Sequence, residues 1–181
     1  MTNAERILAA LDGRLNTKVE LTLYGRAAML LGFANPQPEY ALSHDVDAVL
    51  WLGQAEELAR ATNFWEAVEK TNEELAPRGM YVSHFFAEDQ VILRPSWCEH
   101  RQPIGGDWRR LSLFRLGDLD LLLSKLMRDD PIDRQDALFI VARAGLGRAA
   151  IEEALRQARV PGIPELHEQF SIASRRLLEA M

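Results

Sequence analysis

The sequence predicts an α+β protein in which an α/β-like mixed sheet is followed by helices. Apolar and polar residues alternate over 19–23 and again from Asp45, which is the pattern of strands with one buried face. Apolar residues recur at steps of three and four over 54–75, which indicates an amphipathic helix. After Gly117 the sequence has helical character to its end. We therefore expect the sheet in the earlier part of the chain.

Strands and helices are expected to mix over the first 115 residues. Gly25 ends the first strand, and Pro36 and Pro38 mark a loop before the second. The elements expected here are a helix over 3–15, strands over 19–23 and 45–50, a short buried helix over 27–33, a long helix over 54–75, and strands over 80–86, 91–93 and 111–115.

The remaining residues are expected to form helices over 118–128, 131–144, 147–158 and 164–179. No linker-like composition separates these helices from the segments before them. The sequence therefore predicts a core over 1–115 and a helical part over 116–181 that packs on it, the two forming one structural unit.

Composition excludes several classes of protein. The 181 residues include 21 Lys or Arg and 27 Asp or Glu, which gives a net charge of −6. This balance argues against a general nucleic-acid coat or a binder of anionic membranes. The longest apolar run extends only from Ala137 to Ala142, whereas a bilayer span needs about 20 residues. Because Cys98 is the single cysteine, an internal disulfide is excluded, and we expect a cytoplasmic protein.

A glycine turn and a pair of carboxylates are the features that point to chemistry. Gly25 follows the first strand and opens a helix, whose first N–H groups can bind phosphate. Asp45 and Asp47 lie two positions apart on the next strand, so both side chains point to the same face. Such a pair repels unless a cation lies between the carboxylates, and Mg²⁺ prefers carboxylates combined with water and phosphate oxygens. The arrangement fits nucleotidyl transfer from a nucleoside triphosphate.

Three segments in order carry a resemblance to a known family. Residues 21–30 read Leu-Thr-Leu-Tyr-Gly-Arg-Ala-Ala-Met-Leu, and residues 43–50 read Ser-His-Asp-Val-Asp-Ala-Val-Leu. Residues 121–138 add a lysine on one helix and aspartates that open the next. Over roughly residues 18–145 the chain resembles the nucleotidyltransferase-fold proteins related to the AbiEii toxins. Each motif alone is weak, and their order makes the signal more specific.

The resemblance implies a nucleotidyltransferase-like core with a C-terminal helical part, and it assigns roles to individual residues. Asp45 and Asp47 would be catalytic and would hold Mg²⁺, while Gly25 would face the phosphates. Lys125 would contact the nucleotide, and Asp133 would orient Lys125 or act near the attacking group.

The resemblance also implies substrates and partners. The donor would be a nucleoside triphosphate, and the acceptor would be an RNA end or a protein side chain. Because the AbiEii relatives are toxins of toxin–antitoxin pairs, an antitoxin protein is an expected partner.

The sequence departs from the family at two places. Arg26 stands where the family has Gly or Ser, so its cation could contact a phosphate or fill the pocket. Active members carry a third carboxylate on a neighbouring strand, but the strand expected over 80–86 offers Ser83 and His84 instead. Glu88 and Asp89 follow only in the turn beyond.

Structural interpretations compete with these roles. The aspartate pair could be a solvated strand end, and Arg26 could pair with one of its members in place of a metal. Lys125 and Asp133 could form an ion pair that positions two helices. The chain could accordingly be a non-catalytic module that binds a nucleotide or a protein. An apolar stripe along residues 147–179 could also serve a partner or a dimer contact.

Overall fold

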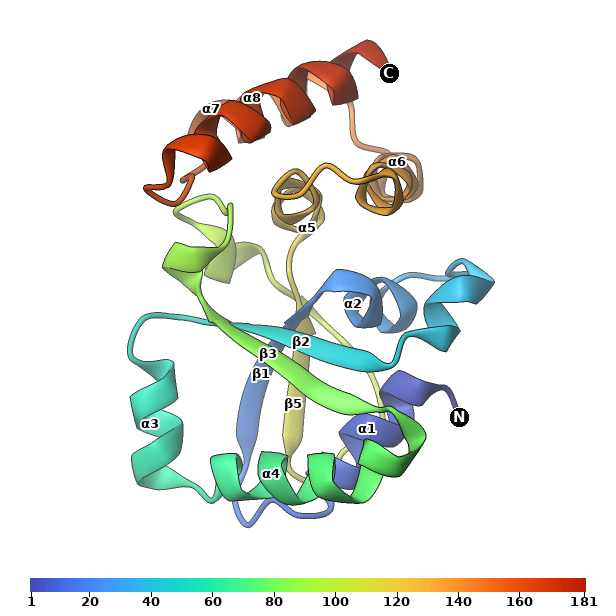
Figure 1. Ribbon diagram of the computed structural model, residues 1–181, viewed down its shortest axis with the longest axis vertical. Coiled ribbons are helices and arrows are strands. Elements are labelled where there is room, and N and C mark those ends of the chain that lie inside the picture. Colours follow the sequence, from blue (N-terminus) through green and yellow to red (C-terminus); the bar gives the residue numbers. More distant parts are fainter. The chain divides into compact units, whose positions relative to one another are not determined.

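The computed structural model describes residues 1–181 and shows a mixed α+β protein, as the sequence predicts (Figure 1). The chain forms two compact units, which the following paragraphs treat separately. The sheet unit comprises residues 1–86 and 102–115, and the helical unit comprises residues 87–101 and 116–181. None of the helices is both long enough and apolar enough to cross a membrane.

The sheet has five strands in the order β3-β2-β1-β5-β4. β1 pairs antiparallel with β2 and parallel with β5, and β5 pairs antiparallel with the short β4, so the sheet is mixed. The strands are β1 (Val19–Tyr24), β2 (Asp45–Leu50), β3 (Tyr81–Ala87), β4 (Gln102–Pro103) and β5 (Leu111–Arg115). Sequence patterns predict four of these strands but not β4, whose two residues carry no alternation.

Four helices accompany the sheet in this unit. They are α1 (Asn3–Asp12), α2 (Gly25–Gly32), α3 (Gln54–Ala61) and α4 (Phe64–Leu75). α1 contacts α4 and β2, whereas α2 contacts β1 and β2 (Figure 1). Short 3-10 turns cover Pro38–Leu42 and Ala76–Arg78. The core contains the fully buried side chains of Leu8, Leu11, Leu23 and Phe64.

The single helix expected over 54–75 is wrong, because the chain breaks at Thr62 and Asn63 into α3 and α4. The Thr62 hydroxyl donates to the Leu58 carbonyl (2.7 Å) and accepts from the Phe64 amide (3.1 Å). The Asn63 side chain donates to the Arg14 carbonyl at 2.8 Å. Short polar side chains can replace helical hydrogen bonds in this way and interrupt a helix. The apolar spacing continues across the interruption, so it does not reveal the break.

Asp12, at the end of α1, fixes the start of β5. Its carboxylate accepts hydrogen bonds from the backbone N–H groups of Arg109 (2.9 Å), Arg110 (2.7 Å) and Leu111 (2.7 Å). Burial alone would raise the pKa of Asp12, but these amides hold the pKa below its ordinary value. The ionised carboxylate therefore belongs to the folded structure.

The helical unit contains α5 (Asp118–Lys125), α6 (Pro131–Ala144), α7 (Arg148–Gln157) and α8 (Pro164–Glu179). α5 contacts α6 and α7, and α6 contacts α8 (Figure 1). The Asp130 carboxylate caps α6 by accepting from the Asp133 amide. The bounds of α6 and α8 match the sequence expectation, and α5 ends earlier than expected.

The strand expected over 91–93 is also wrong. These residues are buried, and Leu93 forms only an isolated bridge with Arg159. The next residue, Arg94, pairs with the fully buried Asp120, whose carboxylate also accepts from the Arg94 amide. The apolar run therefore belongs to the core of the helical unit, which it enters as an extended segment.

Candidate functional site

The glycine turn lies where β1 ends and α2 begins. Gly25 adopts a φ of +70°, a conformation that favours glycine, and it is the first residue of α2. No side chain caps this helix at Tyr24, so the first N–H groups of α2 have no side-chain acceptor at the cap position. A Cβ at Gly25 would lie 3.5 Å from Oδ2 of Asp47, which places that carboxylate against the turn.

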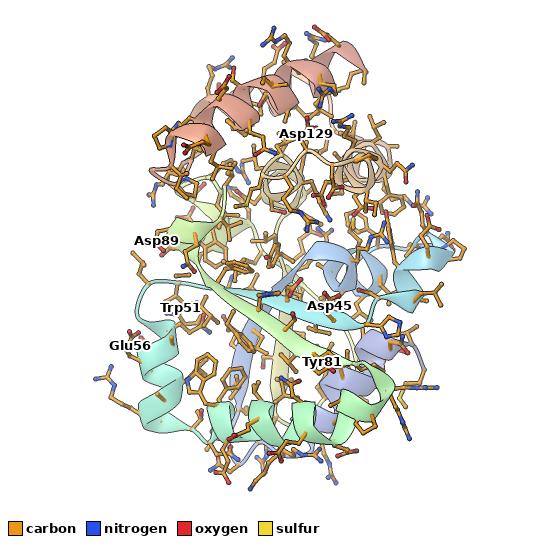
Figure 2. The ribbon with its side chains drawn as sticks, viewed as in Figure 1. Asp45, Trp51, Glu56, Tyr81, Asp89 and Asp129 are labelled. Atoms are coloured by element: carbon orange, nitrogen blue, oxygen red, sulfur yellow. The ribbon has the colours of Figure 1, made fainter.

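The register of β2 explains why the two aspartates share a face. Tyr24 of β1 is opposite Asp47, and the residues between and after the aspartates, Val46 and Ala48, are buried. Asp45 begins the strand and is exposed, and it accepts from the Ser43 hydroxyl at 2.7 Å (Figure 2). Asp47 is half-buried. The two aspartates thus alternate with buried residues on β2, which is the common face that their spacing predicts, and Asp47 is the one that lies against the Gly25 turn.

His84 contacts Asp47, a contact that the sequence does not predict although it places His84 on this strand. On β3, the neighbour of β2, its backbone N–H donates to Oδ1 of Asp47 at 3.2 Å, and its Nδ1 lies 3.1 Å from the same oxygen. The Ser83 hydroxyl lies 2.8 Å from that ring nitrogen. The signal that could have identified His84 is its position on the strand where the resemblance implies a third carboxylate.

The electrostatics of Asp47 are those of a crowded anion. Burial raises the pKa of Asp47, the neighbouring charge of Asp45 raises it further, and the hydrogen bonds from His84 lower it without offsetting the rise. At neutral pH an ionised Asp47 therefore costs folding free energy. A cation bound beside Asp47 would lower that cost. Charged side chains that destabilise the folded protein in this way are typical of binding sites.

We expect Asp47→Asn to raise the free energy of unfolding by about 0.5–2 kcal/mol at neutral pH. Asn keeps an acceptor for the His84 amide and removes the charge. Because a raised pKa means that the folded state binds its proton more tightly, the difference from wild type should shrink as pH falls through the pKa of Asp47. Urea unfolding at several pH values measures the free energy of unfolding of both proteins. Asp45→Asn is the control, and its free energy of unfolding should rise less than that of Asp47→Asn. A less stable Asp47→Asn protein would mean that the carboxylate is a structural anchor.

Arg26 lies on the first turn of α2, and its guanidinium stacks over the ring of the buried Tyr40 at 5.3 Å from the ring centroid. Tyr40 belongs to the 3-10 turn Pro38–Leu42. This cation–π contact ties the start of α2 to the loop that precedes β2.

Lys125 and Asp133 belong to the helical unit, whereas the aspartate pair belongs to the sheet unit. The Lys125 ammonium lies 2.7 Å from Oδ2 of Asp136 and 3.2 Å from Oδ1 of Asp133. All three side chains are buried, with exposed fractions of 7%, 0% and 4% respectively. The more exposed Arg128 also contacts Asp133, at 2.9 Å. An ion cluster between α5 and α6, the structural interpretation of these residues, is therefore present.

The pair on β2 has the donor chemistry of a magnesium site. Carboxylate oxygens suit Mg²⁺, which is commonly held by one or two carboxylates with water and phosphate oxygens completing its shell. The chain contains no group of three or more His, Cys, Asp and Glu side chains arranged to hold a metal ion. A cation held at this pair would therefore take two ligands from Asp45 and Asp47 and its remaining ligands from outside the protein side chains.

Comparisons with protein-family models, curated proteins and solved structures found no match to this chain.

Proposed function

We propose that this chain is a Mg²⁺-dependent nucleotidyltransferase-like protein that transfers a nucleotidyl group from a nucleoside triphosphate to an RNA end or a protein acceptor. The observation that carries the proposal is the carboxylate of Asp47 lying against the Gly25 turn, with Asp45 on the same face of β2. The uncapped start of α2 adds backbone N–H donors at the same place.

In this proposal each part of the site has one task. The N–H groups of the first turn of α2 bind phosphate oxygens, and Gly25 lets the chain turn beside them. Asp45 and Asp47 hold the cation, which when bound neutralises triphosphate charge. The acceptor hydroxyl oxygen bonds to the α-phosphorus while the bond from that phosphorus to the β-phosphate oxygen breaks. Pyrophosphate and the hydroxyl proton leave.

The resemblance to the AbiEii relatives suggests a cellular role for this activity, that of a toxin in a toxin–antitoxin pair. A toxin role would require an RNA or protein acceptor whose modification is harmful, and an antitoxin partner that restrains it. Both follow from the resemblance alone.

The test is transfer of label from α-phosphate-labelled nucleoside triphosphates, each supplied with Mg²⁺, to cellular RNA or to protein. We expect label in one acceptor class with release of pyrophosphate, and loss of both in Asp45→Asn at unchanged folding. Label transfer that persists in Asp45→Asn would show that the aspartate pair is not the catalytic centre.

A non-catalytic module that binds a nucleotide or a protein is the second candidate. His84 favours it, because this imidazole contacts Asp47 where the resemblance implies a third carboxylate that would serve catalysis. Nucleotide binding without transfer of label to any acceptor would select this candidate.

A further inference from the structure

A cavity of about 140 Å³ lies within the helical unit, among α5, α6 and α8. Its apolar lining comes from alanines and leucines: Leu126, Ala137, Leu138, Ala173, Leu177 and Ala180. The cavity is partly open to solvent, so a small molecule can enter it from outside the helical unit. An apolar cavity of nearly the same volume is large enough for a benzene ring.

Charged side chains gather at one side of the same cavity. Asp129 lies in the loop that joins α5 and α6, on the side toward α8 (Figure 2), and it takes a φ of +51°, which is unusual for a residue other than glycine. Its nearly buried carboxylate accepts from Nε of Arg134 at 3.1 Å and from Nη1 of Arg176. Strained backbone of this kind is concentrated at binding sites.

The charge at this side suits one added anion. Two guanidinium groups face the single carboxylate of Asp129, and that carboxylate engages only some of their N–H donors. Lys125, which also lines the cavity, is already neutralised by Asp133 and Asp136. The neighbouring shallow groove carries Glu165 and Glu168 beside Arg128, and the two glutamates repel an anion more strongly the higher its charge. A monocarboxylate therefore fits better than a phosphate.

We propose that this cavity binds a small aromatic monocarboxylate, with its ring among the alanines and leucines and its carboxylate at Arg134 and Arg176. Planar guanidinium groups match carboxylate geometry, and the ring would bury apolar surface against the alanines and leucines. The site lies wholly within the helical unit and is independent of the nucleotidyl-transfer proposal.

The test uses three probes on the isotope-labelled full chain, with binding followed by changes in amide NMR shifts. Phenylacetate should bind with a Kd on the order of 1 mM or tighter and shift signals of α5, α6 and α8. Phenylacetamide has the same shape without the charge and should bind about tenfold more weakly. Acetate has no ring and should not bind. Absence of binding by phenylacetate, or equal affinities for phenylacetate and phenylacetamide, would overturn the proposal.

Two variants locate the binding. Ala173→Leu should fill the cavity, abolish phenylacetate binding and leave the melting temperature at or above that of wild type. Arg134→Gln, at a half-exposed position, should lower phenylacetate affinity toward that of phenylacetamide. Phenylacetate binding that is unchanged in either variant would refute the assigned site, and Arg134→Gln keeps the test decisive if Ala173→Leu fails to fold.

Discussion

Replacing Lys125 with Met is expected to lower the free energy of unfolding by about 3–5 kcal/mol, because it leaves the fully buried carboxylate of Asp136 without its cation and Asp133 with only the exposed Arg128. The Lys125 side chain is 7% exposed, and its partners Asp136 and Asp133 are 0% and 4% exposed. Methionine fills similar volume but cannot donate to either carboxylate. Urea unfolding monitored by circular dichroism measures the loss.

Arg128→Met is the matched control for this experiment. Arg128 contacts the same Asp133, but its side chain is 72% exposed, so its removal should cost less than about 1 kcal/mol. A loss below about 1 kcal/mol in Lys125→Met would contradict the structural role of the cluster and favour a nucleotide contact instead. If Lys125→Met loses several kcal/mol of unfolding free energy, any loss of activity in this variant could result from the loss of stability, so it would not show that Lys125 binds a nucleotide.

Asp12→Ala is expected to lower the free energy of unfolding by about 3 kcal/mol or more, because three backbone donors lose their acceptor at once. The carboxylate is nearly buried and accepts from consecutive amides at the start of β5. Asp12→Asn keeps one acceptor oxygen and should lose less. An alanine variant within about 1 kcal/mol of wild type would show that water replaces the carboxylate in this role.

The same residue sets an acid dependence of stability. Burial opposes ionisation of Asp12, but the three amides outweigh it and lower the pKa from its ordinary value of 3.8. A lowered pKa gives stability that is present above that ordinary value and is lost as pH falls through the pKa of the folded state. Asp12→Asn should lack this part of the acid loss. The free energy of unfolding of wild type and Asp12→Asn, measured at several acidic pH values, tests this. An equal dependence on pH in the two proteins would contradict the role of Asp12.

The parts of the fold that depend on local pattern could be predicted from the sequence. Alternation located β1 and β2, and the spacing of Asp45 and Asp47 gave their common face. The expected helix over 131–144 has the bounds that α6 has in the structure. These features depend only on residues that are close together in the sequence, so they can be predicted from the sequence alone.

The errors arose where distant residues decide the structure. The break at Thr62 and Asn63 is supported by Arg14, which is far away in sequence. Residues 91–93 are buried but belong to no sheet, since Leu93 forms only an isolated bridge. A short apolar run looks the same in sequence whether it is a buried strand or another buried segment. His84 joins the site only because β3 lies beside β2. The burial of Lys125 likewise depends on how α5 and α6 pack.

Thermal melting of wild type and Asp45→Asn with Mg²⁺ and each common nucleoside triphosphate tests whether the aspartate pair and the Gly25 turn form a nucleotide site. Ligand at about 100 times its Kd adds roughly 2.7 kcal/mol of stability, which is a rise of about 5–10 °C for a chain of this size. We expect such a rise in melting temperature with one triphosphate, dependent on Mg²⁺ and absent in Asp45→Asn. No rise with any triphosphate, or an equal rise in Asp45→Asn, would contradict this expectation.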